Sequence, residues 1–135
     1  GRWMVSAMQK KALILDSNEL PTDVAGEIHI LSSREAISGF LEFDSYSGDE
    51  LAFLEDGERL DLVVRRGRKY RDIFGREKYL ADFKYIEAIS TNDFTHSKIF
   101  KLAIIKFLAQ KGIKFEAEST IEELVNTLTN EIGIS

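Results

Sequence analysis

The 135 residues of this chain suffice for one ordinary domain with a sizeable hydrophobic core. The composition, 44% hydrophobic and 30% charged, is that of a globular protein and excludes a largely disordered chain. Cysteine is absent from the sequence, which excludes disulfides and cysteine-ligated zinc or iron–sulfur sites and fits a cytoplasmic protein.

The N-terminal stretch has no signature of a membrane or secreted protein. No apolar run approaches the roughly 18 residues that a membrane span needs, so we expect no membrane partner. Residues 1–11 also lack the long apolar segment of a secretory signal. Because the chain begins with Gly and has methionines at positions 4 and 8, we interpret residues 1–7 as a cloning remnant or flexible N-terminus. Residues 8–135 are then a single α+β domain.

Two short apolar runs open this domain. Residues 11–15 and 27–31 predict an N-terminal pair of strands. Ser32 and Glu35 then have the spacing of a capping box, which predicts the start of a short helix.

The most regular part of the chain follows. Asp56-Gly57 between two apolar runs predicts a β-hairpin with a tight turn. Gly67 and Gly75 occur at similar intervals and predict two further turns. The simplest interpretation is an antiparallel β-meander of about four strands near residues 50–55, 58–66, 68–74 and 77–89.

Two longer helices complete the predicted elements. A broadly apolar segment, 95–111, predicts a helix capped by Thr95. Thr120 and Glu123 form a second capping box ahead of an amphipathic segment. The sequence therefore predicts an α+β fold in which two or three helices pack on one side of an antiparallel sheet.

Positive charge is concentrated in residues 65–78. This segment has seven Lys or Arg and two acidic residues, a net charge of about +5 in a chain whose formal net charge is −5. Aromatic residues interleaved with cations are typical of nucleic-acid binding, where cations pair with phosphates and rings stack on bases. The predicted binding residues are Arg65, Arg66, Arg68, Lys69, Tyr70, Arg71, Phe74, Arg76 and Lys78.

The same concentration of charge also has purely structural interpretations. Charged side chains protect an exposed hairpin against edge-to-edge aggregation. The arginines can also pair with the excess carboxylates of the protein itself. An acidic protein surface is an alternative partner to nucleic acid, and a homodimer or fusion to a larger protein stays open as well.

A second pattern carries a catalytic hypothesis. Residues 79–84, YLADFK, have the form apolar-apolar-apolar-Asp-x-Lys. This resembles the motif of PD-(D/E)xK nucleases, in which two carboxylates hold Mg²⁺ and a lysine helps to position the attacking water. The resemblance implies a site built from Asp61, Asp82 and Lys84, with the two carboxylates within about 5 Å of each other. The expected meander opposes this, because it places a strand between Asp61 and Asp82.

The remaining patterns point to no cofactor. His29 and His96 lack the spacing of a metal site, so we expect no bound metal. Our main hypothesis is a non-enzymatic module that binds an anionic partner through the basic hairpin. The alternatives are a Mg²⁺-dependent nuclease and a small adaptor or inhibitor that docks another protein.

Overall fold

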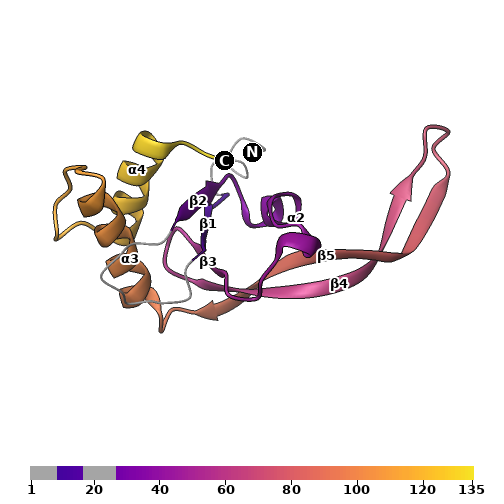
Figure 1. The fold of residues 1–135 in the computed structure, drawn as a ribbon, viewed down its shortest axis with the longest axis horizontal. Helices are drawn as coiled ribbons and strands as arrows, with labels where there is room; N and C mark the ends of the chain where they lie inside the picture. The colour runs from indigo at the N-terminus through magenta and orange to yellow at the C-terminus, as the bar shows by residue number, and fades with distance from the viewer. Residues whose placement is uncertain (1–8, 17–26) are drawn as a thin grey trace.

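The computed structural model describes residues 9–16 and 27–135, so the stretch 1–7 interpreted as a cloning remnant lies outside the described residues. Figure 1 shows a body of strands and helices from which one long hairpin projects. The described strands form one sheet in the order β2-β1-β3-β4-β5, and every neighbouring pair is antiparallel. The strands are β1 (Ala12–Leu15), β2 (Ile28–Leu31), β3 (Leu51–Leu54), β4 (Arg59–Arg71) and β5 (Glu77–Asp93).

The helices cover both faces of this sheet. They are the 3₁₀ turns η1 (Arg34–Ala36) and η2 (Phe43–Ser45) and the α-helices α2 (Ile37–Phe40), α3 (Ser97–Gln110) and α4 (Ile121–Ile132). The predicted α+β class with an antiparallel sheet is therefore confirmed. The helices do not all pack on one side, however, because α3 and α4 lie against one face and α2 lies against the other.

The sequence of β1 explains why both faces are covered. All four of its residues are apolar and buried, and successive side chains of a strand point to opposite faces. Leu13 and Leu15 pack with residues of α3 and α4 in one hydrophobic cluster. Ala12 and Ile14 belong to a second cluster, which includes Ile37 of α2. A strand that is apolar on both sides requires cover on both sides.

The hairpin predicted at Asp56-Gly57 is confirmed. Gly57 has φ +95°, and its N–H donates to the carbonyl of Leu54 at 2.9 Å. The N–H of Leu54 donates in turn to the carbonyl of Glu58 at 2.8 Å, which begins the pairing of β3 with β4. Leu60 of β4, three residues after Gly57, lies in the core and is 2% exposed.

The predicted turn at Gly67 does not exist, because β4 continues through it. Residues on both sides pair with β5, Arg66 with Lys84 and Arg68 with Leu80. One residue of β4 therefore opposes three residues of β5, and Gly67 takes φ +86° at this bulge. A glycine with positive φ suits a bulge as well as a turn, so the local pattern could not separate the two. The meander thus has three strands in place of the predicted four.

Two of the three predicted helix caps differ from expectation. The segment after Ser32 forms a 3₁₀ turn whose N-cap is Ser33, without a side-chain capping bond. Helix α3 begins at Ser97, and its N-cap is His96, not Thr95. The hydroxyl and backbone N–H of Thr95 both donate to Asp93 Oδ1, at 2.6 and 2.9 Å. These two bonds also lower the pKa of Asp93. A charged carboxylate is a stronger acceptor than a hydroxyl, and it organises this turn instead.

The third predicted cap, at the start of α4, is confirmed. The N–H of Glu123 donates to Thr120 Oγ1 at 3.1 Å, and the N–H of Thr120 donates to Glu123 Oε1 at 2.8 Å. The bond from the Thr120 backbone is the main cause that lowers the pKa of Glu123 below its ordinary value of 4.5.

Acid should weaken α4 through this cap. A carboxyl whose pKa is lowered by folding stabilises the fold above its unfolded pKa, and that contribution is lost as the pH falls through its folded pKa. The Glu123→Gln variant lacks the contribution at every pH. The difference in Tm between the two proteins, measured by circular dichroism, should therefore shrink between about pH 6 and about pH 3. A difference that stays constant over this range would contradict a role for the carboxylate charge.

The hairpin bulge should tolerate no side chain at position 67. A Cβ built on Gly67 would lie 2.0 Å from the Tyr79 hydroxyl oxygen, whereas one on Gly75, with φ +77°, meets nothing within 4 Å. The left-handed backbone costs both alanine variants about 1–2 kcal/mol. Only Gly67→Ala must also displace the Tyr79 ring. In hydrogen exchange, Gly67→Ala should lose protection on both sides of the bulge, and Gly75→Ala only at the hairpin tip. Equal losses in the two variants would show that Tyr79 does not matter here.

Candidate binding surface on the projecting hairpin

The long hairpin of β4 and β5 leaves the body and ends in solvent (Figure 1). We call residues 65–84 the arm. Its outer part bends away from the line of its inner part, as Figure 1 shows. Every side chain from 68 to 84 is exposed except that of Asp72, which is half-buried. The nine predicted binding residues all lie in the arm, and all are exposed: Arg65, Arg66, Arg68, Lys69, Tyr70, Arg71, Phe74, Arg76 and Lys78.

The arm and the rest of the chain carry opposite charge. The arm has eight Lys or Arg and three Asp or Glu, a net charge of +5. The formal net charge of the chain is −5, so the remaining residues together carry −10. Like charges gathered on one projecting element create a local positive potential that the acidic remainder does not surround.

Ion pairs account for only part of the arm's positive charge. Arg65 pairs with Glu87 at 2.8 Å, Lys69 with Glu77 at 3.6 Å and Arg76 with Asp72 at 3.1 Å. Among the described residues, the other five arm cations are in no ion pair with a carboxylate. They are Arg66, Arg68, Arg71, Lys78 and Lys84.

The pairing of the two strands sorts the outer arm into two faces. Arg68 lies opposite Leu80, and Tyr70 lies opposite Lys78. Because side chains alternate along a strand, these four share one face, which we call the cationic face. Each of its cations lies across from an aromatic or aliphatic side chain. The opposite face holds the Lys69–Glu77 pair.

The tip of the arm is a tightly bonded turn organised by Asp72. Its carboxylate accepts from the backbone N–H groups of Phe74 and Arg76, both at 2.9 Å, and from Arg76 Nε at 3.1 Å. The N–H of Gly75 donates to the carbonyl of Asp72 at 2.9 Å. A turn of this kind followed by a positive-φ glycine is a common hairpin connection. Asp72 therefore serves the tip and is not available to neutralise the cationic face.

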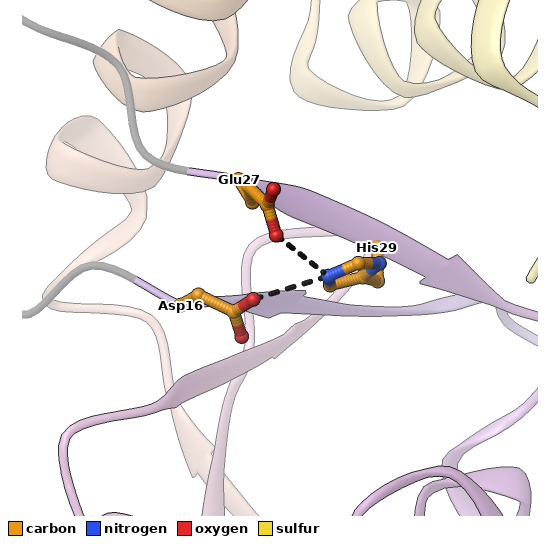
Figure 2. Close-up of side chains that lie close together, drawn as sticks. All are labelled: Asp16, Glu27 and His29. Atoms are coloured by element: carbon orange, nitrogen blue, oxygen red, sulfur yellow. Dashed lines mark hydrogen bonds and ion pairs between the residues drawn. The ribbon is translucent and has the colours of Figure 1, made fainter.

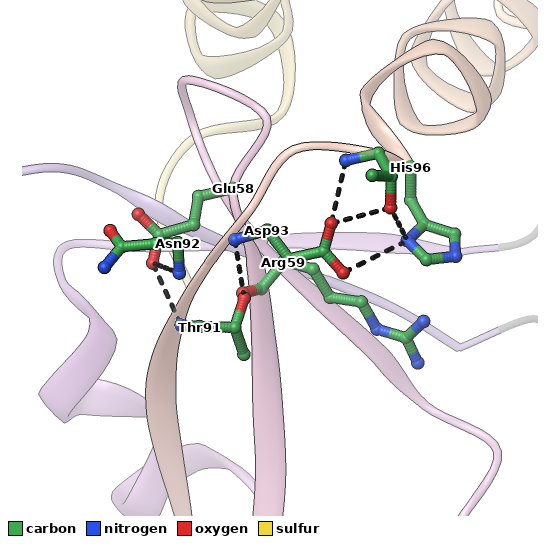
Figure 3. A network of polar contacts seen from close by, with 7 residues as sticks. Glu58, Arg59, Thr91, Asn92, Asp93 and His96 are labelled. Carbon is green, nitrogen blue, oxygen red and sulfur yellow. Dashed lines mark hydrogen bonds and ion pairs between the residues drawn. The ribbon is translucent and has the colours of Figure 1, made fainter.

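A buried carboxylate fixes the root of the arm. Glu58 is 5% exposed, and its Oε2 accepts from the backbone N–H groups of Thr91 and Asn92, at 3.2 and 3.3 Å (Figure 3). It also accepts from the hydroxyl of Ser90. The hydroxyl of Thr91 donates to the carbonyl of Arg59 at 2.6 Å. This network holds β5 where its register against β4 shifts between Arg59 and Leu60. The sequence offers no signal for it, because Glu58 resembles any polar residue that follows a turn.

The structure does not assemble the predicted nuclease site. β4 and β5 are adjacent strands, so no strand intervenes, contrary to the expected meander. However, Asp61 lies opposite Ile89, seven residues along β5 from Asp82, which corresponds to about 23 Å. Asp82 and Lys84 line a shared groove of about 640 Å³, and Asp61 is not part of it. The two carboxylates therefore cannot hold one Mg²⁺ between them as the resemblance implies.

A cluster that sequence reasoning missed surrounds His29 (Figure 2). His29 Nε2 lies 3.1 Å from Asp16 Oδ2 and 3.5 Å from Glu27 Oε2. Asp16 follows β1 and Glu27 precedes β2, so strand pairing brings together residues that are distant in sequence. The three donors lie within 4.8 Å of one another and are of a type that binds divalent cations. As they stand, they form a partly exposed cluster of polar contacts around the His29 ring.

Removing the Asp72 carboxylate should open the tip. In Asp72→Ala, the N–H groups of Phe74 and Arg76 lose their acceptor, so their amide exchange measured by NMR should accelerate several-fold. Asp72→Asn is the matched control, since its amide oxygen can still accept both bonds. The Tm should not change in either variant, because the tip lies outside both core clusters. Identical exchange in the two variants would contradict the role assigned to Asp72.

None of the described helices is long and apolar enough to cross a membrane. A scan against models of known protein families, a search of curated proteins and a search of solved structures found no match to this chain. A function is therefore proposed from the chemistry of the arm itself.

Proposed function

We propose that this chain is a non-enzymatic module that binds nucleic acid through its arm. The observation that carries the proposal is the placement of Arg66 directly opposite Lys84, with no ion pair to either among the described residues. Like charges opposed across two strands destabilise the pair. A phosphate bound between them would relieve that repulsion, so the arrangement favours an anionic ligand over the isolated protein.

The composition of the cationic face favours nucleic acid over other anions. Arg68 and Lys78 are suited to phosphate oxygens, and a guanidinium can contact two oxygens at once. Tyr70 and Leu80, 42% and 47% exposed, alternate with these cations and offer surfaces against which bases can pack. A two-stranded ribbon is also an element that DNA-binding proteins place in a groove of the duplex.

The acidic body confines the contact to the arm. The residues outside the arm carry a net charge of −10 and repel phosphates. The phosphate contacts should therefore be limited to the five arm cations that lack a carboxylate partner among the described residues. The salt dependence of binding is limited accordingly, because it grows with the number of phosphates that the protein neutralises. For duplex DNA, the slope of log K against log salt concentration should be no steeper than about −4.5.

Fluorescence anisotropy with labelled single- and double-stranded DNA and RNA tests the proposal. The test variant is Arg66→Ala/Arg68→Ala/Lys78→Ala, and it should weaken binding and flatten the salt slope by about 2.7. Its Tm should not fall, because all three side chains are exposed and the change removes one opposed pair of like charges.

The control is Lys98→Ala/Lys111→Ala/Lys114→Ala, which makes the same change in net charge at exposed positions of the body. It should bind like the unchanged protein. Equal weakening in both variants would indicate a general charge effect and not an interface. If no nucleic acid binds at all, the proposal fails, and an acidic protein surface becomes the partner to seek.

A further inference from the structure

The tip of the arm exposes two large apolar side chains. Ile73 is 94% exposed and Phe74 is 74% exposed, the two highest values among the large hydrophobic residues in the described part of the chain. They occupy the central positions of the Asp72–Gly75 turn, where polar residues and glycine are the usual choice. Turn formation therefore does not account for them, and both lie outside the core clusters.

Hydrogen bonds and a ring contact within the tip fix the turn that carries this apolar pair. The Asp72 carboxylate accepts from the backbone N–H groups of Phe74 and Arg76, and Arg71 Nη1 donates to the carbonyl of Gly75 at 3.0 Å. The guanidinium of Arg76 lies 5.1 Å from the centre of the Phe74 ring. An element that is ordered in advance loses less entropy on binding.

We propose that Ile73 and Phe74 form a wedge that inserts between neighbouring base pairs of a DNA duplex and bends it. The inference rests on the proposed function and specifies its ligand. Isoleucine and phenylalanine side chains are among those that part stacked bases from the minor groove, while flanking cations hold the phosphates. Arg71, one of the arm cations without a carboxylate partner among the described residues, lies next to the tip, and the cationic face continues from the tip along the arm.

The distribution of charge favours a duplex over a lipid surface, which also accepts an apolar tip with basic neighbours. A membrane interface accommodates an inserted element to a depth of about 5–10 Å. The cations of β4 extend from Arg71 back to Arg66, about 17 Å along the strand. If only the tip inserted, cations so far from it would not reach a lipid headgroup, whereas a duplex lying along the bent arm would contact them.

The test compares duplexes that differ in the free energy needed to unstack their bases. The protein is titrated into an intact duplex and into the same duplex with two adjacent mismatches, each with a donor and an acceptor fluorophore at its ends. A wedge should bind the mismatched duplex roughly tenfold more tightly, because parting unpaired bases requires less free energy. It should also raise the energy transfer between the ends as the duplex bends.

Two tip variants identify the wedge. Ile73→Ser/Phe74→Ser should lose the mismatch preference and the bending but keep the salt-sensitive binding, whereas Phe74→Leu should keep all three. Unchanged end-to-end transfer and equal affinity for both duplexes, with salt-sensitive binding intact, would overturn the wedge and leave the proposed function standing. Binding to vesicles of anionic phospholipid, with none to either duplex or to single-stranded DNA or RNA, would overturn both.

Discussion

The pairing of β4 with β5 is the interaction on which the fold and the candidate site both depend. At the inner end of this pair, Leu60 and Ile86 are buried in the second core cluster. At the outer end the same two strands form the arm, which has no hydrophobic core of its own among the described residues. A two-stranded hairpin alone is marginally stable in water. The arm therefore persists because its root is part of a packed sheet and its tip is closed by the Asp72 turn.

Local contacts shape the arm between these two anchors. Gly67 leaves room for the ring of Tyr79, which occupies the space that a Cβ would need. The guanidinium of Arg68 lies 5.6 Å from the centre of the Phe83 ring, on the other side of the bulge. Such exposed contacts are individually weak. The bulge at Gly67 bends the hairpin, and these contacts accompany the bend without making the arm part of the core.

Features that depend on residues close together in the sequence could be predicted from it, and features that depend on distant residues could not. The Asp56-Gly57 turn and the Thr120–Glu123 cap were predictable because each depends on residues within four positions of one another. The conformation at Gly67 was not predictable, since a turn and a bulge differ only in whether the residues after Gly67 still pair with β5. The role of Glu58 depends on its bonds to a part of β5 that lies more than thirty residues further along the chain. The basic segment was recognisable from composition alone, but the division of its cations between ion pairs and the cationic face required the pairing of the strands.

Edge protection and the proposed recognition of a ligand make different demands on the residues of the arm. β5 is an edge strand of the sheet, and charged residues on an edge hinder pairing with another chain. Edge protection accounts for cations on the arm, but charges of either sign would serve. It does not explain why Arg66 faces Lys84, and it is opposed by Ile73 and Phe74, because an exposed apolar tip invites the association that edge charges prevent. The proposed binding of a duplex accounts for all three features: the excess of positive charge, like charges in opposition, and an apolar tip between arginines.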